Sequence, residues 1–113
     1  MRRLPSGTRL SKLSISGNNY EFATHTWLSK LKDSRGKARI VERIRSAERG
    51  NFGDCESVGN GVSEMRVHFG PGYRVYFSRT GNVVYVLLCG GTKRGQQRDI
   101  SKAQAMALQL KED

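Results

Sequence analysis

The sequence predicts one α+β domain, a twisted, mainly antiparallel sheet with a two-helix hairpin and a C-terminal helix packed on one side. Its 113 residues suffice for one domain and leave little room for a second core. Apolar residues recur at helical spacing up to about residue 49 and alternate with polar residues from residue 62 onward. Glycine-rich turns separate the alternating segments, and a last helical pattern follows them.

Residues 1–19 form a basic N-terminal segment with weak periodicity, four positive charges and no acidic residue. Within this segment, the stretch 10–15 is either a short edge strand or part of a flexible arm. We expect residues 20–113 to form the single domain.

Two helices joined by a turn at 33–36 are expected to begin this domain as an antiparallel hairpin. Three apolar residues on one helical face predict the first helix, over 24–33: Trp27, Leu28 and Leu31. A longer apolar stripe predicts the second helix, over 37–49: Ile40, Val41, Ile44 and Ala47. Gly50 ends the second helix, whose outer face is basic.

Two alternating strands, 62–69 and 73–78, are expected after a Gly-, Asn- and Asp-rich connection at 50–61. Between them, Gly70-Pro71-Gly72 is a turn signal. The expected cross-strand partners are Phe69 with Tyr73, His68 with Arg74, Val67 with Val75, Arg66 with Tyr76, and Met65 with Phe77.

Alternation assigns the side chains of these strands to two faces, and a register error of one residue would leave the alternation of each strand intact. The first face is apolar and should pack beneath the helices: Met65, Val67, Phe69, Tyr73, Val75 and Phe77. The second face carries a polar cluster: Arg66, His68, Arg74 and Tyr76.

The last predicted strand, 83–89, is apolar at nearly every position, so we expect it to be central and covered on both faces. Gly90-Gly91 should break this strand, and the loop 92–98 that follows is polar and basic. A final helix is expected over about 100–110, where Ser101 and Gln104 fit a capping box.

Charge is the first indication of function, because the formal net charge is +10 and the pI is about 10.2. Such a balance favours a polyanionic partner, either nucleic acid or an acidic protein surface. Basic residues gather in 1–20, 30–49 and 93–102, while 50–92 is neutral. Either these flanks bind a phosphate backbone, or they are a solvated surface kept for solubility. The candidate RNA-binding residues are Arg39, Arg43, Arg45, Arg94 and Arg98.

The residue types on the polar face suit RNA cleavage, in which a 2′-hydroxyl attacks the neighbouring phosphate. His68 is suited to proton transfer near neutral pH, and Tyr76 could act as a base if neighbouring guanidinium groups lower its pKa. Arg66 and Arg74 suit bidentate phosphate contact, and Lys93 could reach the same face. Each of these side chains has an alternative reading as an ordinary surface residue. The cluster therefore indicates phosphate binding more strongly than it indicates cleavage.

Several other classes of protein are excluded or disfavoured. No apolar run is long enough for a membrane-spanning helix, and the N-terminus has no apolar stretch typical of a secretory signal. Cys55 and Cys89 have no metal-type spacing, and we expect two free thiols in a reducing cytoplasm. We expect neither a metal nor another cofactor.

Two sequence runs resemble the HigB-like addiction-module killer proteins of the RelE/ParE toxin superfamily. They are Gly-Pro-Gly-Tyr-Arg-Val-Tyr-Phe at 70–77 and Leu-Leu-Cys-Gly-Gly at 87–91, and the resemblance extends over roughly 24–107. It implies a RelE-like fold and a partner antitoxin, usually a helix-turn-helix DNA-binding protein. Many members of the superfamily cleave messenger RNA on the ribosome, and others poison DNA gyrase. This chain differs from the group in having Phe69 where Tyr is commoner and Thr92 where Asp is commoner.

Two functions of different classes follow from the resemblance. The first is a metal-independent, ribosome-dependent endoribonuclease that inhibits translation in the cytoplasm, with Arg66, His68, Arg74, Tyr76 and Lys93 as its catalytic residues. The second is a non-enzymatic inhibitor of an acidic partner such as gyrase, which should tolerate loss of those side chains. A general RNA-binding module is a third possibility, with Tyr76 as its main stacking residue.

Overall fold

The computed structural model describes residues 20–112 apart from 81–83, and its elements are three helices and a four-stranded sheet. Two helices come first, α1 (Tyr20–Lys30) and α2 (Ser34–Glu48). The strands are β1 (Cys55–Gly59), β2 (Val62–Val67), β3 (Tyr73–Thr80) and β4 (Val84–Thr92). A 3-10 turn, η2 (Lys93–Gly95), leads into α3 (Gln96–Glu112). The α+β class is confirmed, whereas the suggested strand at 10–15 lies outside the described residues.

The sheet is an antiparallel meander in the order β1-β2-β3-β4. β1 was missed in the sequence, where 50–61 was interpreted as a connection. β4 was expected to be central, but in the described sheet it lies at one edge. The other half of that prediction is confirmed, because helices cover both faces of β4 and account for its apolar character.

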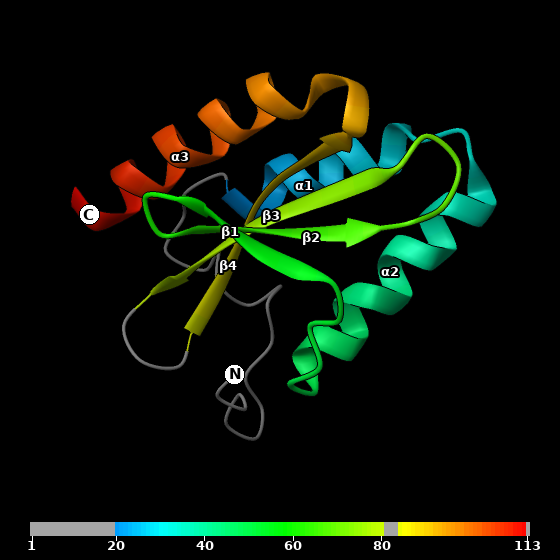
Figure 1. The fold of residues 1–113 in the computed structure, drawn as a ribbon, viewed down its shortest axis with the longest axis horizontal. Helices are drawn as coiled ribbons and strands as arrows, with labels where there is room; N and C mark the ends of the chain where they lie inside the picture. Colours follow the sequence, from blue (N-terminus) through cyan, green and yellow to red (C-terminus); the bar gives the residue numbers. More distant parts are fainter. Residues whose placement is uncertain (1–19, 81–83, 113) are drawn as a thin grey trace.

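The helices pack on opposite faces of the sheet, so the prediction that all of them lie on one side is wrong (Figure 1). On one face, α1 lies over β4 and α2 lies over β2 and β3. Their core includes Ile40, Met65, Val75 and Phe77. On the other face, α3 lies across β4 and β3 and forms a second core that includes Tyr76, Leu88 and Ala103.

Gly90 and Gly91 explain how both helices approach β4 so closely. The two residues were expected to break the strand, but they lie within β4 and pair with Val75 and Arg74. A Cβ at Gly90 would overlap the indole ring of Trp27 on α1, and a Cβ at Gly91 would overlap the carboxylate of Asp99 on α3. Because successive residues of a strand point to opposite faces, each glycine admits one helix.

The β2–β3 hairpin keeps the predicted faces but not the predicted partners. Val67 pairs with Tyr73 and Arg66 with Arg74, which is a shift of two residues from the expected register. The turn includes Phe69, whose N–H donates to the carbonyl of Val67. A shift of two leaves every side chain on its predicted face, because strand side chains repeat every two residues. The apolar set therefore faces α1 and α2, as expected.

Asp33 begins α2 and ties it to the sheet. It was expected in a turn, but it is the N-cap residue, and its carboxylate accepts a hydrogen bond from the Gly36 N–H at 3.0 Å. The same carboxylate accepts the Tyr73 hydroxyl at 2.7 Å. These bonds lower the pKa of Asp33, whereas burial and this carboxylate raise the pKa of Tyr73 to about 12. One acidic residue therefore holds the helix start against the first residue of β3.

Candidate nucleic-acid interface

Glu64 is the centre of the polar face, although the sequence analysis did not select it. Its side chain is 0% exposed. It accepts hydrogen bonds from Arg66 Nε at 3.0 Å, the Tyr76 hydroxyl at 2.9 Å and Gln96 Nε2 at 2.8 Å. Burial opposes its ionisation, but these bonds outweigh burial and the pKa of Glu64 is lowered. The predicted cationic cluster is thus built around a buried anion.

Arg66 is balanced by further carboxylates. Besides Glu64, its guanidinium contacts Glu56 and lies 3.8 Å from Asp54. The hydrogen bonds to Glu64 and Glu56 raise the pKa of Arg66. A phosphate at this arginine would have to compete with three negative charges that the fold already supplies.

Arg74 is nearly enclosed, with 7% of its surface exposed. Its Nε lies 3.7 Å from Glu64, and this buried Nε has no hydrogen-bond partner. A second guanidinium nitrogen, Nη1, approaches the space beside Gly72, where the stem of Lys93 also lies. Lys93 itself is exposed, and its backbone N–H donates to the Gly72 carbonyl at 2.7 Å. These contacts bring Arg74 and Lys93 together beside Gly72 of the hairpin turn.

Tyr76 is in the core and not on an accessible face. Its side chain is 0% exposed beneath α3, and its hydroxyl donates to Glu64. Burial and this carboxylate raise the pKa of Tyr76 and outweigh the opposite effect of Arg74, so the condition for Tyr76 to act as a base is not met. A buried phenol bound to a carboxylate is a poor general base for an external substrate.

His68 follows β2 at the hairpin turn, and 69% of its side chain is exposed. Its Nε2 lies 2.5 Å from a carboxylate oxygen of Asp54, in the loop before β1. The hydrogen bond to His68 lowers the pKa of Asp54. A carboxylate at one ring nitrogen fixes the orientation of an imidazole and leaves Nδ1 to exchange a proton.

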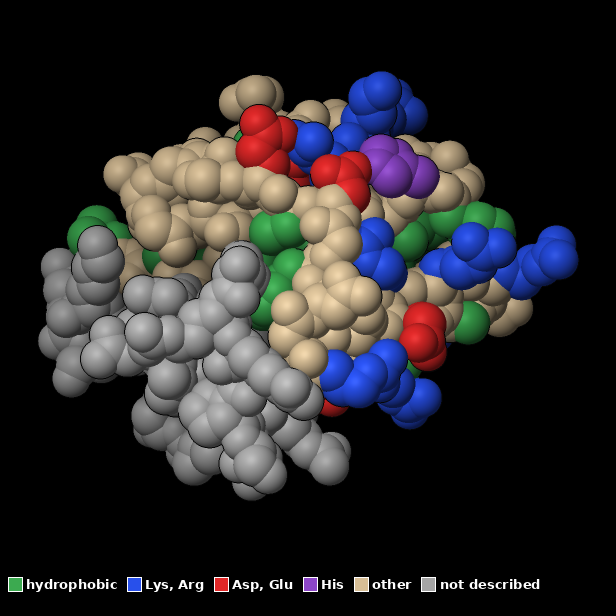
Figure 2. All heavy atoms as spheres, turned by 60° about the horizontal axis from the view of Figure 1, so that its bottom comes forward, with side chains coloured by type: hydrophobic (Ala, Val, Ile, Leu, Met, Phe, Trp, Pro, Cys, Tyr) green, Lys and Arg blue, Asp and Glu red, His purple; other side chains and the backbone are tan. Residues whose placement is uncertain are grey.

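The remaining predicted arginines have different environments. Arg43 donates to the backbone carbonyls of Arg66, Phe52 and Asp54, which occupies its guanidinium within the fold. Arg39 lies over the ring of Phe69, 4.9 Å from its centroid. The other three are exposed: Arg45 on α2, Arg94 in η2 and Arg98 on α3, beside Asp99. Basic side chains on the face in Figure 2 are interleaved with acidic ones and do not form an unbroken patch.

Asp54, Glu64 and Gln96 are the site residues that sequence reasoning missed. Glu64 alternates with Arg66 along β2, so its place on the polar face was available from the pattern. Asp54 could be placed only after β1 was known, because pairing of β1 with β2 brings it opposite Arg66. For Gln96 the sequence offers no signal, since its position depends on which face α3 covers.

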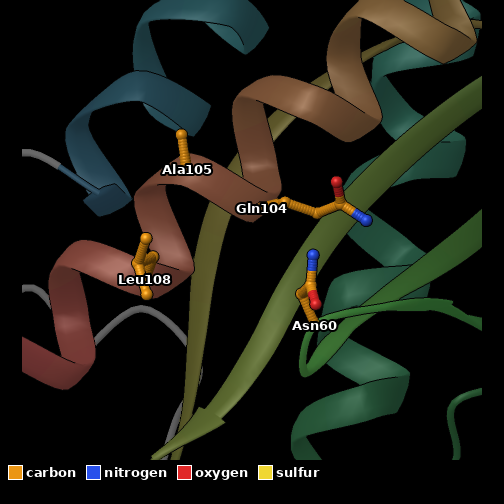
Figure 3. Close-up of a pocket in the computed structure, with 4 residues that line it drawn as sticks. All are labelled: Asn60, Gln104, Ala105 and Leu108. Carbon is orange, nitrogen blue, oxygen red and sulfur yellow. The ribbon is translucent and has the colours of Figure 1, made fainter.

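A separate hollow of about 300 Å³ lies between α3 and the β1–β2 turn. Asn60 and Gln104 approach each other across it, and Ala105 and Leu108 line it from α3 (Figure 3). It contains no titratable side chain, so it offers no acid–base chemistry.

Metal and membrane signals are absent from the described parts of the chain. No group of three His, Cys, Asp or Glu side chains among the residues in 20–80 and 84–112 could hold a metal ion. No helix in those ranges is long and apolar enough to cross a membrane. Cys55 and Cys89 are free thiols, as predicted.

Comparison with known proteins places the chain beside a bacterial relative. No family model and no solved structure matches it. An uncharacterized protein of Haemophilus influenzae (strain ATCC 51907 / DSM 11121 / KW20 / Rd) is 48% identical to it over 85 residues. The match covers 75% of this chain and 86% of the relative. The chain therefore belongs to the same family as this Haemophilus influenzae protein.

Proposed function

We propose that the protein is the toxin of a toxin–antitoxin pair and that it cleaves messenger RNA on the ribosome, in the cytoplasm. Its antitoxin would be a helix-turn-helix DNA-binding protein. The motifs at 70–77 and 87–91 and the net charge of +10 support this proposal. The observation that carries it is the exposed His68, oriented by Asp54 at the hairpin turn, where Arg74 of β3 and Lys93 of η2 approach Gly72.

These residues suit one reaction. The 2′-oxygen of a ribose attacks the neighbouring phosphorus while His68 accepts the hydroxyl proton, and the bond from phosphorus to the 5′-oxygen breaks. The products are a 2′,3′-cyclic phosphate and a 5′-hydroxyl, which takes its proton from solvent or from His68. The exposed Lys93 would stabilise the added negative charge on the phosphorane, and the nearly enclosed Arg74 would add positive charge from beneath the surface. Tyr76 is inaccessible, so it cannot act as a second acid–base residue. The ribosome would contribute by aligning the ribose 2′-oxygen with the phosphorus.

A non-enzymatic inhibitor of the gyrase type is the second candidate. The observation that favours it is the neutralisation of Arg66 by three carboxylates, together with the burial of Tyr76. These features remove two of the five predicted catalytic side chains from easy contact with substrate. The exposed basic residues Arg45, Arg94 and Arg98 remain available for binding an acidic partner.

The two histidines allow a matched test. His68→Ala removes the proposed proton acceptor, and His25→Ala changes an exposed histidine on α1, which packs on the other face of the sheet. Each variant and the wild type would be expressed by induction, and the 5′ ends of cellular messages mapped. We expect growth arrest with new 5′-hydroxyl ends in coding regions for the wild type and His25→Ala, and neither effect for His68→Ala. Arrest with intact messages would overturn the ribonuclease proposal and favour gyrase, to be tested by DNA supercoiling assays.

A further inference from the structure

The guanidinium of Arg43 joins α2 to the loop that carries Asp54. Arg43 is partly buried, and its Nη2 donates to the carbonyls of Phe52 at 2.9 Å and Asp54 at 3.3 Å. Its Nη1 donates to the carbonyl of Arg66 on β2. Three backbone carbonyls from two segments of the chain therefore converge on one side chain. Their oxygens carry partial negative charge, so without the guanidinium they would repel one another and lose these donors.

Arg43 binds the sheet where the β1–β2 ladder ends. The outermost partners at this end are Cys55 and Met65. One step further, the Arg66 N–H donates to the Asp54 carbonyl at 2.9 Å, as in a regular ladder. The Arg66 carbonyl accepts from Arg43, whereas in a regular antiparallel pair it would accept from the Asp54 N–H. Arg43 therefore binds both segments at the point where the loop leaves the sheet.

Gly53 allows the loop backbone to lie directly against this guanidinium. A Cβ at Gly53 would lie 2.8 Å from the nearest guanidinium nitrogen of Arg43. The residue also has a φ of 61°, in the left-handed region that favours glycine. The sequence thus has no side chain at the one position in the loop where it would push Arg43 away.

This loop is the segment that orients His68. Asp54 follows Gly53 directly, and a carboxylate oxygen of Asp54 lies 2.5 Å from His68 Nε2. The hydrogen bond to His68 is the largest cause of the lowered pKa of Asp54, and the charges of Arg66 and Arg43 add to it. A small displacement of the loop would weaken this hydrogen bond, because its strength depends steeply on distance and angle.

We propose that Arg43 is a positioning residue, which holds the loop at 52–54 so that Asp54 can orient His68. Arg43 acts on the imidazole through Asp54 and does not itself contact RNA. This role rests on the proposed ribonuclease function, in which His68 accepts the 2′-hydroxyl proton. It replaces the expected RNA contact of Arg43, whose guanidinium is directed at backbone carbonyls beside the site.

Arg43→Lys tests this role, because it keeps the positive charge but replaces the planar fork of donors by a single amino group. Arg49→Lys is the matched control, since Arg49 caps the end of α2 and its side chain is 65% exposed. Carbon-13 NMR of the Asp54 carboxyl carbon would follow its titration. We expect the pKa of Asp54 to rise toward its ordinary value of 3.8 in Arg43→Lys and to stay unchanged in Arg49→Lys. Because lysine conserves the charge, such a rise would report displacement of Asp54 from His68.

Cleavage of cellular messages, measured by mapping 5′-hydroxyl ends, is the second readout. It should fall by about tenfold to a hundredfold in Arg43→Lys, because a misplacement of about 1 Å can cost a hundredfold in rate. Arg49→Lys should cleave like the wild type. If the wild type cleaves no message, the proposed function fails, but the titration of Asp54 still tests the role of Arg43.

Gly53→Ala gives the same test from the loop if Arg43→Lys does not fold, because its methyl group would overlap the guanidinium. It should also raise the pKa of Asp54. A pKa of Asp54 that stays at the wild-type value, or that rises equally in the Arg43 and Arg49 variants, would overturn the proposal.

Discussion

Replacement of Glu64 by glutamine tests whether a buried carboxylate holds the polar face together. The change preserves the shape of the side chain but removes the charge that compensates Arg66 and Arg74. Removing one partner of a buried ion pair costs about 3–5 kcal/mol, because the other charge stays buried without compensation. The amide can still accept a hydrogen bond from Tyr76 or Gln96, so we expect a loss near the lower end, about 3 kcal/mol.

Thermal and urea unfolding would measure this loss. For a domain of this size, each kcal/mol corresponds to about 4–8 °C in Tm, so Glu64→Gln should lower Tm by about 12–24 °C. Glu56→Gln is the matched control, because Glu56 also binds Arg66 but its side chain is 60% exposed. Screening by solvent makes such a pair weak, and the control should lower Tm by only a few degrees. Similar losses in the two variants would refute the reasoning.

The pH dependence gives an independent readout of the same residue. The pKa of Glu64 is lowered in the folded protein from an ordinary value of 4.5. Its contribution to stability is therefore present above about pH 4.5 and is lost as the pH falls through the folded pKa. Glu64→Gln should make this part of the stability profile shallower, with Asp33 and Asp54 supplying the remainder, whereas Glu56→Gln should leave it unchanged.

Three further predictions concern the packing of the helices and the start of β3. Gly90→Ala places a methyl group against the ring of Trp27, so it should destabilise the protein by about 1–3 kcal/mol and change the tryptophan fluorescence. Gly95→Ala is the control and should show neither effect, because its methyl group meets the end of a flexible arginine. Asp33→Ala removes the N-cap of α2 and the acceptor of the Tyr73 hydroxyl, and it should lower Tm more than Asp33→Asn does. Because the pKa of Tyr73 is raised to about 12, its contribution to stability is complete below pH 10 and is lost as the pH rises toward 12. Tyr73→Phe should remove this late step from a titration of tyrosine absorbance.

Much of the sheet could be predicted because alternation is a strong signal where one face is apolar. In β2 and β3 it assigned every face correctly, even though the register was wrong by two residues. β1 escaped detection because Cys55–Gly59 lies at an edge and includes no fully buried residue, so its sequence has no apolar face to reveal. Its place in the sheet depends on pairing with β2, which no local pattern expresses.

The position of α3 could have been inferred from β4, but the prediction of helices on one side prevented it. A strand that is apolar at nearly every position needs cover on both faces. Leu87 faces α1 and α2, whereas Val86 and Leu88 belong to the core beneath α3. The paired glycines carried the same information, since Gly90 and Gly91 point to opposite faces and each approaches one helix. A strand covered by helices on both sides satisfies both patterns, and a one-sided arrangement satisfies neither.

The candidate site shows the limit of reading charges from a sequence. Alternation placed Arg66 and Arg74 on one face, but what these cations can do depends on the anions beside them. With Glu64 buried between them, a phosphate reaching Arg66 must displace a carboxylate, which exchanges one ion pair for another and gains little. Lys93 and His68 are exposed at the hairpin turn and face no comparable exchange at the buried carboxylate. If the protein cleaves RNA, substrate contact should therefore begin at the turn, and Arg66 should act mainly by holding Glu64 and Asp54 in place.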